Sequence, residues 1–279
     1  MGLLSFRGCF INLDQNQQRL ALMTRQLADA GLAEAYERAP AVNGFTLGPE
    51  YKTNLDRGSL GLWLTHERLV AAHQSRDLHL HILEDDALIP IDAAHSFSVL
   101  LEAADRTTPD WEIIFTDMLF KPDTVLQRSL SRAMEIYRQT RELCLTSLKR
   151  VPFSCMSSFF VNRKSVEKYL NLLSGRWREG KPIDLHVRSL IMAGKLASYV
   201  CLPFATSISS ESDRSDIRGD LDISRAVMNL YRRSIYKDAD LKSLREEFDR
   251  LTAGLEVSDF DEFFLQITRF FLSSRFAAF

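Results

Sequence analysis

The sequence contains little cysteine and no long apolar run. Its 279 residues include only four cysteines, Cys9, Cys144, Cys155 and Cys201, which stand far apart. They form neither the Cys-x-x-Cys spacing of a zinc site nor the density of a disulfide scaffold, so we expect reduced, buried thiols. No apolar run reaches the roughly 20 residues that span a bilayer. We therefore expect a cytoplasmic protein, which could still lie against a membrane surface.

An excess of charge of one sign is also missing. The 35 basic and 37 acidic residues leave a formal net charge of -2, without the basic tracts that a broad nucleic-acid surface needs. The phosphate-binding patterns Gly-x-x-x-x-Gly-Lys-Ser/Thr and Gly-x-Gly-x-x-Gly are absent, as is the Gly-x-Ser-x-Gly elbow of serine hydrolases. We expect a small ligand. Neither a P-loop nucleotidase nor a Rossmann dinucleotide enzyme is indicated, and we expect no nucleic-acid partner.

The sequence does contain enough apolar residues, 46%, for a large core. Strand-like and helix-like segments alternate up to about residue 203, which predicts an α/β fold with a mainly parallel central sheet. The first helix is expected to follow Asp14 as its N-cap and to end at Gly31, and Asn43-Gly44 to form a turn. The expected strands cover 8–13, 36–44, 78–86, 110–117, 154–161 and 196–203, and the later helices cover 58–75, 126–148, 165–173 and 184–194.

Helical patterns alone follow the polar connector 209–220. They predict a catalytic domain over 1–219 and a helical appendage over 220–279, with helices at 222–236, 240–251 and 258–271. The last helix, with Ser258 as its N-cap, carries an apolar stripe of Phe260, Phe263, Phe264, Ile267, Phe270 and Phe271. Such a stripe needs burial against the protein's own helices, in a homodimer or on a membrane. The membrane is the least favoured because the polar face carries acids.

Residues 81–90, HILEDDALIP, place three acids, Glu84, Asp85 and Asp86, at the end of an apolar strand. Ligands of α/β proteins bind beyond the carboxyl ends of the strands. Carboxylates there suit Mg²⁺ or Mn²⁺, which often bridges the protein to a diphosphate. Alternatively, Asp85 or Asp86 caps a following helix, or the acids are solvated in a loop. Ile89-Pro90 is a poor helix start and disfavours the cap.

Several blocks occur in the order of glycosyltransferase family 25, which the chain resembles over residues 7 to 210. These blocks are CFINLDQNQQR, YERAPAVNG, GSLGLWLTHERL, HILEDDALI, FFVNRKSVEKYL and PIDLHVRSL. The resemblance implies a GT-A-like nucleotide-sugar fold and a metal-dependent, inverting transfer of a hexose to a lipooligosaccharide or other glycan. Galactose from UDP-galactose is the first choice, at the cytoplasmic face of an inner membrane. The chain departs from the family at Thr65, where serine is common, and at Asn43, where aspartate is common.

The resemblance also assigns roles to residues. Glu84 and Asp86 would bind Mn²⁺ or Mg²⁺ as the equivalent of an Asp-x-Asp motif. The donor would be bound by Asn12, Leu13, Asp14, Arg19, His66 and Asp85. Arg19 could instead form a surface ion pair, and His66 could be a capping or core hydrogen-bonder.

Inversion needs a second carboxylate, away from the metal, to take the proton of the acceptor hydroxyl. Asp184 is the first candidate and Asp117 the second, although the former could be an N-cap and the latter a solvated acid. Arg214 and Arg218 could close over the diphosphate or remain exposed loop charges. Two other functions stay open: a GT-A-like protein that binds a glycan or partner without catalysis, and a metal-dependent phosphoesterase.

Overall fold

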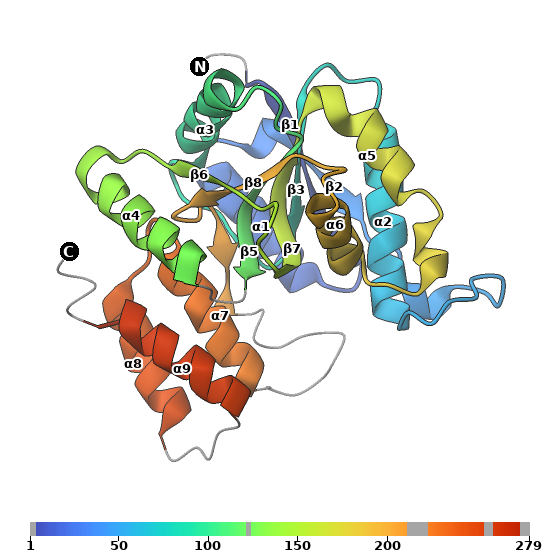
Figure 1. Cartoon of the computed structure of the whole chain (residues 1–279). Coiled ribbons are helices and arrows are strands. Elements are labelled where there is room, and N and C mark those ends of the chain that lie inside the picture. Colours follow the sequence, from blue (N-terminus) through green and yellow to red (C-terminus); the bar gives the residue numbers. More distant parts are fainter. Residues whose placement is uncertain (1–3, 121–123, 211–222, 254–258, 274–279) are drawn as a thin grey trace.

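The computed structural model describes residues 4–120, 124–210, 223–253 and 259–273. A central sheet is covered by helices on both faces (Figure 1), which confirms the expected α/β class. The strands are β1 (Phe6–Asn12), β2 (Tyr36–Pro40), β3 (His79–Glu84), β4 (Ala87–Leu88), β5 (Ile113–Phe120), β6 (Cys144–Ser147), β7 (Phe153–Val161), β8 (Ser198–Leu202) and β9 (Ser207–Ile208). The α-helices are α1 (Gln17–Asp29), α2 (Arg57–His73), α3 (Ala93–Thr107), α4 (Thr124–Thr140), α5 (Val166–Leu173), α6 (Ile183–Met192), α7 (Ile223–Ile235), α8 (Leu241–Thr252) and α9 (Asp259–Phe271). Short 3₁₀ turns are η1 (Ala33–Ala35), η2 (Gly44–Thr46), η3 (Arg163–Ser165) and η4 (Arg176–Glu179).

The main sheet has seven strands in the order β2-β1-β3-β7-β5-β8-β6. β1 pairs in parallel with β2 and β3, and β5 pairs in parallel with β8. β7 runs antiparallel between β3 and β5, and β6 is antiparallel to β8. The sheet is therefore mixed but mostly parallel, and β1, β3 and β5 end at the same edge. β4 and β9 form a separate two-stranded sheet after the acidic run.

The alternation of side chains along the strands builds a core on each face of the sheet. In β3, Ile82 belongs to the cluster packed by α2, α5 and α6, whereas Leu83 belongs to the cluster packed by α1 and α3. β1 divides in the same way, with Ile11 in the first cluster and Phe10 in the second. This period of two is the pattern on which the strands were predicted.

The C-terminal helices α7, α8 and α9, drawn in orange and red in Figure 1, share the first of these clusters with the sheet. Phe264 and Phe271 of α9 both contact the ring of Tyr231 in α7, with ring centroids 5.9 and 5.7 Å apart. The expected apolar stripe is thus buried within the chain at Phe264, Ile267 and Phe271. Phe270, which is 55% exposed, does not belong to the buried face. Ser258 lies outside the described residues, and so do the side chains of Phe260 and Phe263.

Three sequence predictions need correction. The helix expected over 126–148 ends at Thr140, because Arg141 takes a left-handed conformation with φ 62°, and β6 then pairs with β8. The first helix begins at Gln17, so Asp14 is not its N-cap, and the capping position falls on Asn16. Cys9 and Cys201 are buried free thiols as expected, but Cys144 and Cys155 are only half-buried. No helix among the described residues is long and apolar enough to cross a membrane.

Candidate functional site

The acidic run forms a tight turn at the carboxyl end of β3. Glu84 is the last residue of β3, and only Asp85 and Asp86 separate it from Ala87, where β4 begins. The next helix, α3, starts at Ala93, and its N-cap position is Asp92. Asp85 and Asp86 therefore cap no helix, which removes one of the alternatives to a binding role. The backbone oxygen of Asp86 accepts a hydrogen bond from Ser209 at 2.8 Å, next to the β4–β9 pair.

Asp85 is tied to the end of β1 and to α1. Its Oδ2 accepts a hydrogen bond from Asn12 Nδ2 at 2.6 Å, and its Oδ1 accepts one from Arg19 at 3.1 Å. Arg19 therefore already has an ion-pair partner within the protein. The ion pair between Asp85 and Arg19 is mostly buried, with side chains 10% and 17% exposed. Asp85 consequently holds the turn in position.

Asn12 is itself held in place by β2. Its Oδ1 accepts a hydrogen bond from Arg38 Nε at 2.9 Å, and Arg38 also binds Asp14. The carboxylate of Asp14 thus forms an ion pair where an N-cap was expected. Leu13 is half-buried, and its carbonyl oxygen accepts a hydrogen bond from Asn16 at 2.9 Å. The residues at the end of β1 lie beside the acidic turn, connected to it through Asn12.

Asp117 of β5 is fully buried and paired with Arg232 of α7. Arg232 Nη2 lies 2.5 Å from Oδ2, and Nε lies 3.2 Å from Oδ1, so the guanidinium spans both carboxylate oxygens. Arg232 also donates to Ser157 Oγ in β7. The reading of Asp117 as a solvated acid is therefore wrong, since the side chain is 0% exposed. The pair also fixes α7 to the carboxyl end of β5.

Asp184 lies in the first turn of α6, one residue after the helix begins at Ile183. It is not the N-cap, a position that Pro182 occupies. Its Oδ2 accepts a hydrogen bond from the backbone of Cys155 at 3.0 Å, and its Oδ1 accepts one from Leu185 at 2.8 Å. Cys155 has the positive φ of 61° that non-glycine residues rarely adopt, and such backbone strain occurs most often at functional sites.

The charges of these residues act on one another. Burial and then the charge of Asp86 raise the pKa of Glu84 to about 8, and the charges of Arg232, Asp85 and Asp184 act on the same carboxyl. Burial also raises the pKa of Asp86, against the opposing charges of Arg19 and Arg232. The fold thus gathers carboxylates from the acidic turn, β5 and α6 around Arg232, with Arg19 beside the turn. The part of these pKa shifts that comes from neighbouring carboxylates reflects a negative local potential, which favours an added cation.

A hard divalent cation fits this turn in part. Asp86 Oδ1 is buried and has no hydrogen-bond partner among the described residues, so one carboxylate oxygen is free to be a ligand. Within the same residues, no group of three or more His, Cys, Asp or Glu side chains is arranged to hold a metal by itself. The turn therefore suits an ion such as Mg²⁺, which commonly uses one or two carboxylates and takes its other ligands from water and substrate phosphates.

His66 is not among the hydrogen-bonded residues of this site. It is 0% exposed and stacks on Phe159 of β7 with ring centroids 5.9 Å apart, which puts it in the core between α2 and the sheet. Neither of its ring nitrogens has a hydrogen-bond partner in the described part of the chain, so the alternative role as a core hydrogen-bonder is not seen either. Burial lowers the pKa of His66 to about 4, which keeps the ring neutral.

Sequence reasoning missed Arg232, Arg38 and Cys155. Arg232 occurs within an apolar helix pattern, YRRSIY, and an arginine on a buried helix face is a usable sign of a paired carboxylate. Arg38 is an ordinary strand residue and gives no such sign. Arg214 and Arg218 lie outside the described residues.

Comparison of the chain with protein-family models and with curated proteins finds no match.

Proposed function

We propose that this protein is a metal-dependent, inverting glycosyltransferase of the family 25 type, with a GT-A-like fold. Its donor would be a UDP-hexose, with UDP-galactose as the first choice, and its acceptor a glycan such as a lipooligosaccharide. The observation that carries the proposal is the acidic turn at the carboxyl end of β3. There Asp86 offers a buried, unpartnered carboxylate oxygen beside Arg19 and Arg232.

The turn supports recognition of a diphosphate. Asp86, with Glu84 in support, would bind Mn²⁺ or Mg²⁺, which when bound neutralises the charge of the departing nucleoside diphosphate. Asp85 is already occupied by Asn12 and Arg19, so its role is to hold the turn in position. Asn12, Leu13 and Asp14 follow at the end of the neighbouring strand β1, where the base and ribose of the donor would bind.

The geometry favours Asp184 over Asp117 as the general base. Both oxygens of Asp117 are engaged by Arg232, a permanently charged partner that opposes proton uptake. Each oxygen of Asp184 accepts one backbone hydrogen bond and keeps further acceptor capacity, and the side chain is half-buried rather than sealed. Asp184 would therefore take the proton of the acceptor hydroxyl, while Asp117 would position Arg232.

The proposal is tested by a screen of UDP-sugars with Mn²⁺ in which the release of UDP and of free sugar is measured. A transferase hydrolyses its donor slowly without an acceptor, and Asp184→Asn should lower turnover by about 100 to 10,000-fold while UDP binding persists. If Asp117→Asn lowers turnover while UDP binding persists, and Asp184→Asn does not, then Asp117 is the general base. Release of inorganic phosphate would indicate a phosphoesterase, and UDP binding without any turnover would indicate a non-catalytic binding protein.

A further inference from the structure

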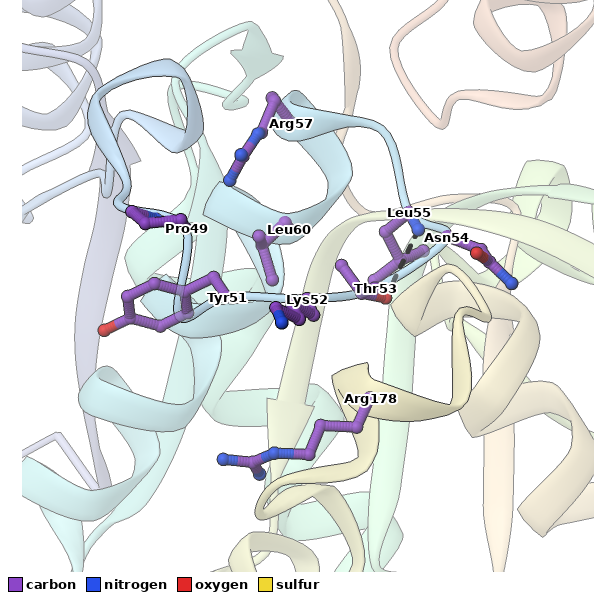
Figure 2. A pocket seen from close by; sticks show the side chains of 9 residues that line it. All are labelled: Pro49, Tyr51, Lys52, Thr53, Asn54, Leu55, Arg57, Leu60 and Arg178. Atoms are coloured by element: carbon purple, nitrogen blue, oxygen red, sulfur yellow. Dashed lines mark hydrogen bonds between the residues drawn. The ribbon is translucent and has the colours of Figure 1, made fainter.

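A cationic cavity lies between the segment that follows β2 and the turn that precedes α6. It has a volume of about 530 Å³ and is lined by Pro49, residues 51 to 55, Arg57, Leu60 and Arg178. Figure 2 shows the extended segment from Pro49 to Leu55 running between Arg57, at the start of α2, and Arg178 of η4. The lining contains three basic side chains and no acidic one.

These three cations have no carboxylate within ion-pair distance among the described residues. Lys52, Arg57 and Arg178 form no ion pair with a carboxylate in the described part of the chain. Arg57 Nη1 is buried and lacks a hydrogen-bond partner there. Arg178 lies over the ring of Trp177, 4.2 Å from its centroid, which orients the guanidinium without balancing its charge. Buried donors without acceptors are rare, and a ligand oxygen would satisfy this one.

Glu50 is exposed and is not part of the cavity lining, and three other nearby acids are engaged elsewhere. Asp56 caps α2 by accepting a hydrogen bond from Ser59 at 2.8 Å. Glu67, whose charge acts on Arg178, accepts a hydrogen bond from the backbone of Gly175 at 2.5 Å. Glu179 pairs with Arg176 at 2.9 Å. The cavity therefore keeps a net positive lining, which an anionic ligand would balance.

The walls of the cavity are held in place by close packing. A Cβ on Gly44 would lie 1.6 Å from the carbonyl oxygen of Arg57, so η2 can touch the start of α2 only because residue 44 is glycine. On the other wall, Thr53 donates a hydrogen bond to the carbonyl oxygen of Trp177 at 2.8 Å, and the rings of Tyr51 and Trp177 lie 5.6 Å apart. These contacts fix the two chain segments relative to each other before any ligand binds.

We propose that this cavity binds a phosphate or carboxylate group carried by the acceptor glycan. The inference rests on the proposed function, in which Asp184 receives the proton of the acceptor hydroxyl. Arg178 precedes Asp184 by only six residues, a separation of at most about 22 Å along an extended chain. An oligosaccharide of a few sugars can bridge that distance, with its anionic group held by the arginines and its reactive hydroxyl near Asp184. A site whose charged lining residues are all basic complements the acidic turn, which would bind the donor diphosphate together with a metal.

The test uses simple probes in buffer from which metal ions have been removed with a chelating resin, so that the acidic turn cannot retain phosphate and no soluble polycarboxylate competes for the cavity. Glucose 6-phosphate, glucuronate and neutral glucose are titrated into the full-length protein, and binding is followed by calorimetry. The cavity variant Lys52→Gln/Arg178→Gln is compared with the control Arg106→Gln/Lys195→Gln, which removes the same charge from exposed residues outside the cavity. Thermal unfolding establishes that both variants are folded.

We expect one or both anionic sugars to bind the wild-type protein and the control, and glucose to bind neither. The cavity variant should lose roughly tenfold or more in affinity, because charge-assisted hydrogen bonds are removed. Preference for one anionic sugar identifies phosphate or carboxylate as the ligand group. Equal losses in the cavity and control variants, or no binding of either anion to the wild type, would overturn the inference. A protein that releases UDP from a UDP-sugar but binds neither anion would refute this inference alone and leave the proposed function intact.

Discussion

Replacement of Arg232 by methionine should destabilise the protein by about 3 to 5 kcal/mol. The side chain of Asp117 is 0% exposed and that of Arg232 is 6% exposed, and two nitrogen–oxygen contacts of 2.5 and 3.2 Å join them. Methionine fills much of the volume of the arginine stem but leaves the carboxylate of Asp117 buried without a partner. The free energy of unfolding of the variant is lower because water solvates the unpaired carboxylate far better in the unfolded chain than the protein interior does.

Urea unfolding at pH 7 measures this effect, with Arg163→Met as a matched control. Arg163 pairs with Asp77 at 3.6 Å, but Asp77 is 97% exposed, so this substitution should cost no more than about 1 kcal/mol. The double variant Asp117→Asn/Arg232→Met should recover part of the lost stability, since position 117 then carries no unpaired charge. If Arg232→Met loses no more stability than Arg163→Met, the pair does not contribute as the geometry indicates.

Three further outcomes are expected. Burial lowers the pKa of His66 to about 4. Between pH 6.5 and 4 the unfolded chain therefore binds a proton at this residue that the folded chain does not bind, so the protein loses stability as the pH falls through this range. His66→Phe should therefore lose less stability than wild type between pH 7 and 5 in urea unfolding, and an unchanged loss would contradict this. Burial, with the charge of Asp86, raises the pKa of Glu84 to about 8, so the folded state holds a proton that the unfolded state releases near pH 4.5. The metal-free protein should accordingly lose stability as pH rises from 4.5 to 8, and thermal unfolding of Glu84→Gln should show a weaker fall; a fall of the same size would refute the assignment. Phe264→Ala should cost about 3 to 5 kcal/mol in urea unfolding, whereas Phe270→Ala, at a position 55% exposed, should cost little, and similar costs would show that the buried face of α9 is misassigned.

The strands that carry the fold were predictable because their apolar residues alternate regularly between two buried faces. β3 was expected over 78–86 and is found at His79–Glu84, since the acidic turn ends it. β6 could not be predicted, because its four residues, CLTS, follow a helical pattern and become a strand only by pairing with β8. α3 was missed although its sequence carries helical spacing, with Phe97, Leu100 and Ala104 all buried.

The candidate site was predictable only where polar residues end a strand. Such positions identified the acidic turn and Asn12, because strand ends of an α/β sheet meet at one edge. The sequence could not show that Asp117 is paired with Arg232, since 115 positions separate them and the pairing depends on how α7 docks. His66 was assigned to the donor site by resemblance, but it packs against Phe159, a contact that only the tertiary fold determines.

Metal-dependent binding of UDP tests the central claim most directly. Calorimetric titration of UDP, with and without Mn²⁺, should be compared for the wild type, Asp86→Asn and Asp77→Asn, in which an exposed acid loses the same charge. The wild type and Asp77→Asn should bind UDP when Mn²⁺ is present and lose that binding when it is chelated, whereas folded Asp86→Asn should gain no affinity from Mn²⁺. If folded Asp86→Asn binds UDP and Mn²⁺ as tightly as the wild type, the acidic turn is not the cation and diphosphate site, and the account is wrong.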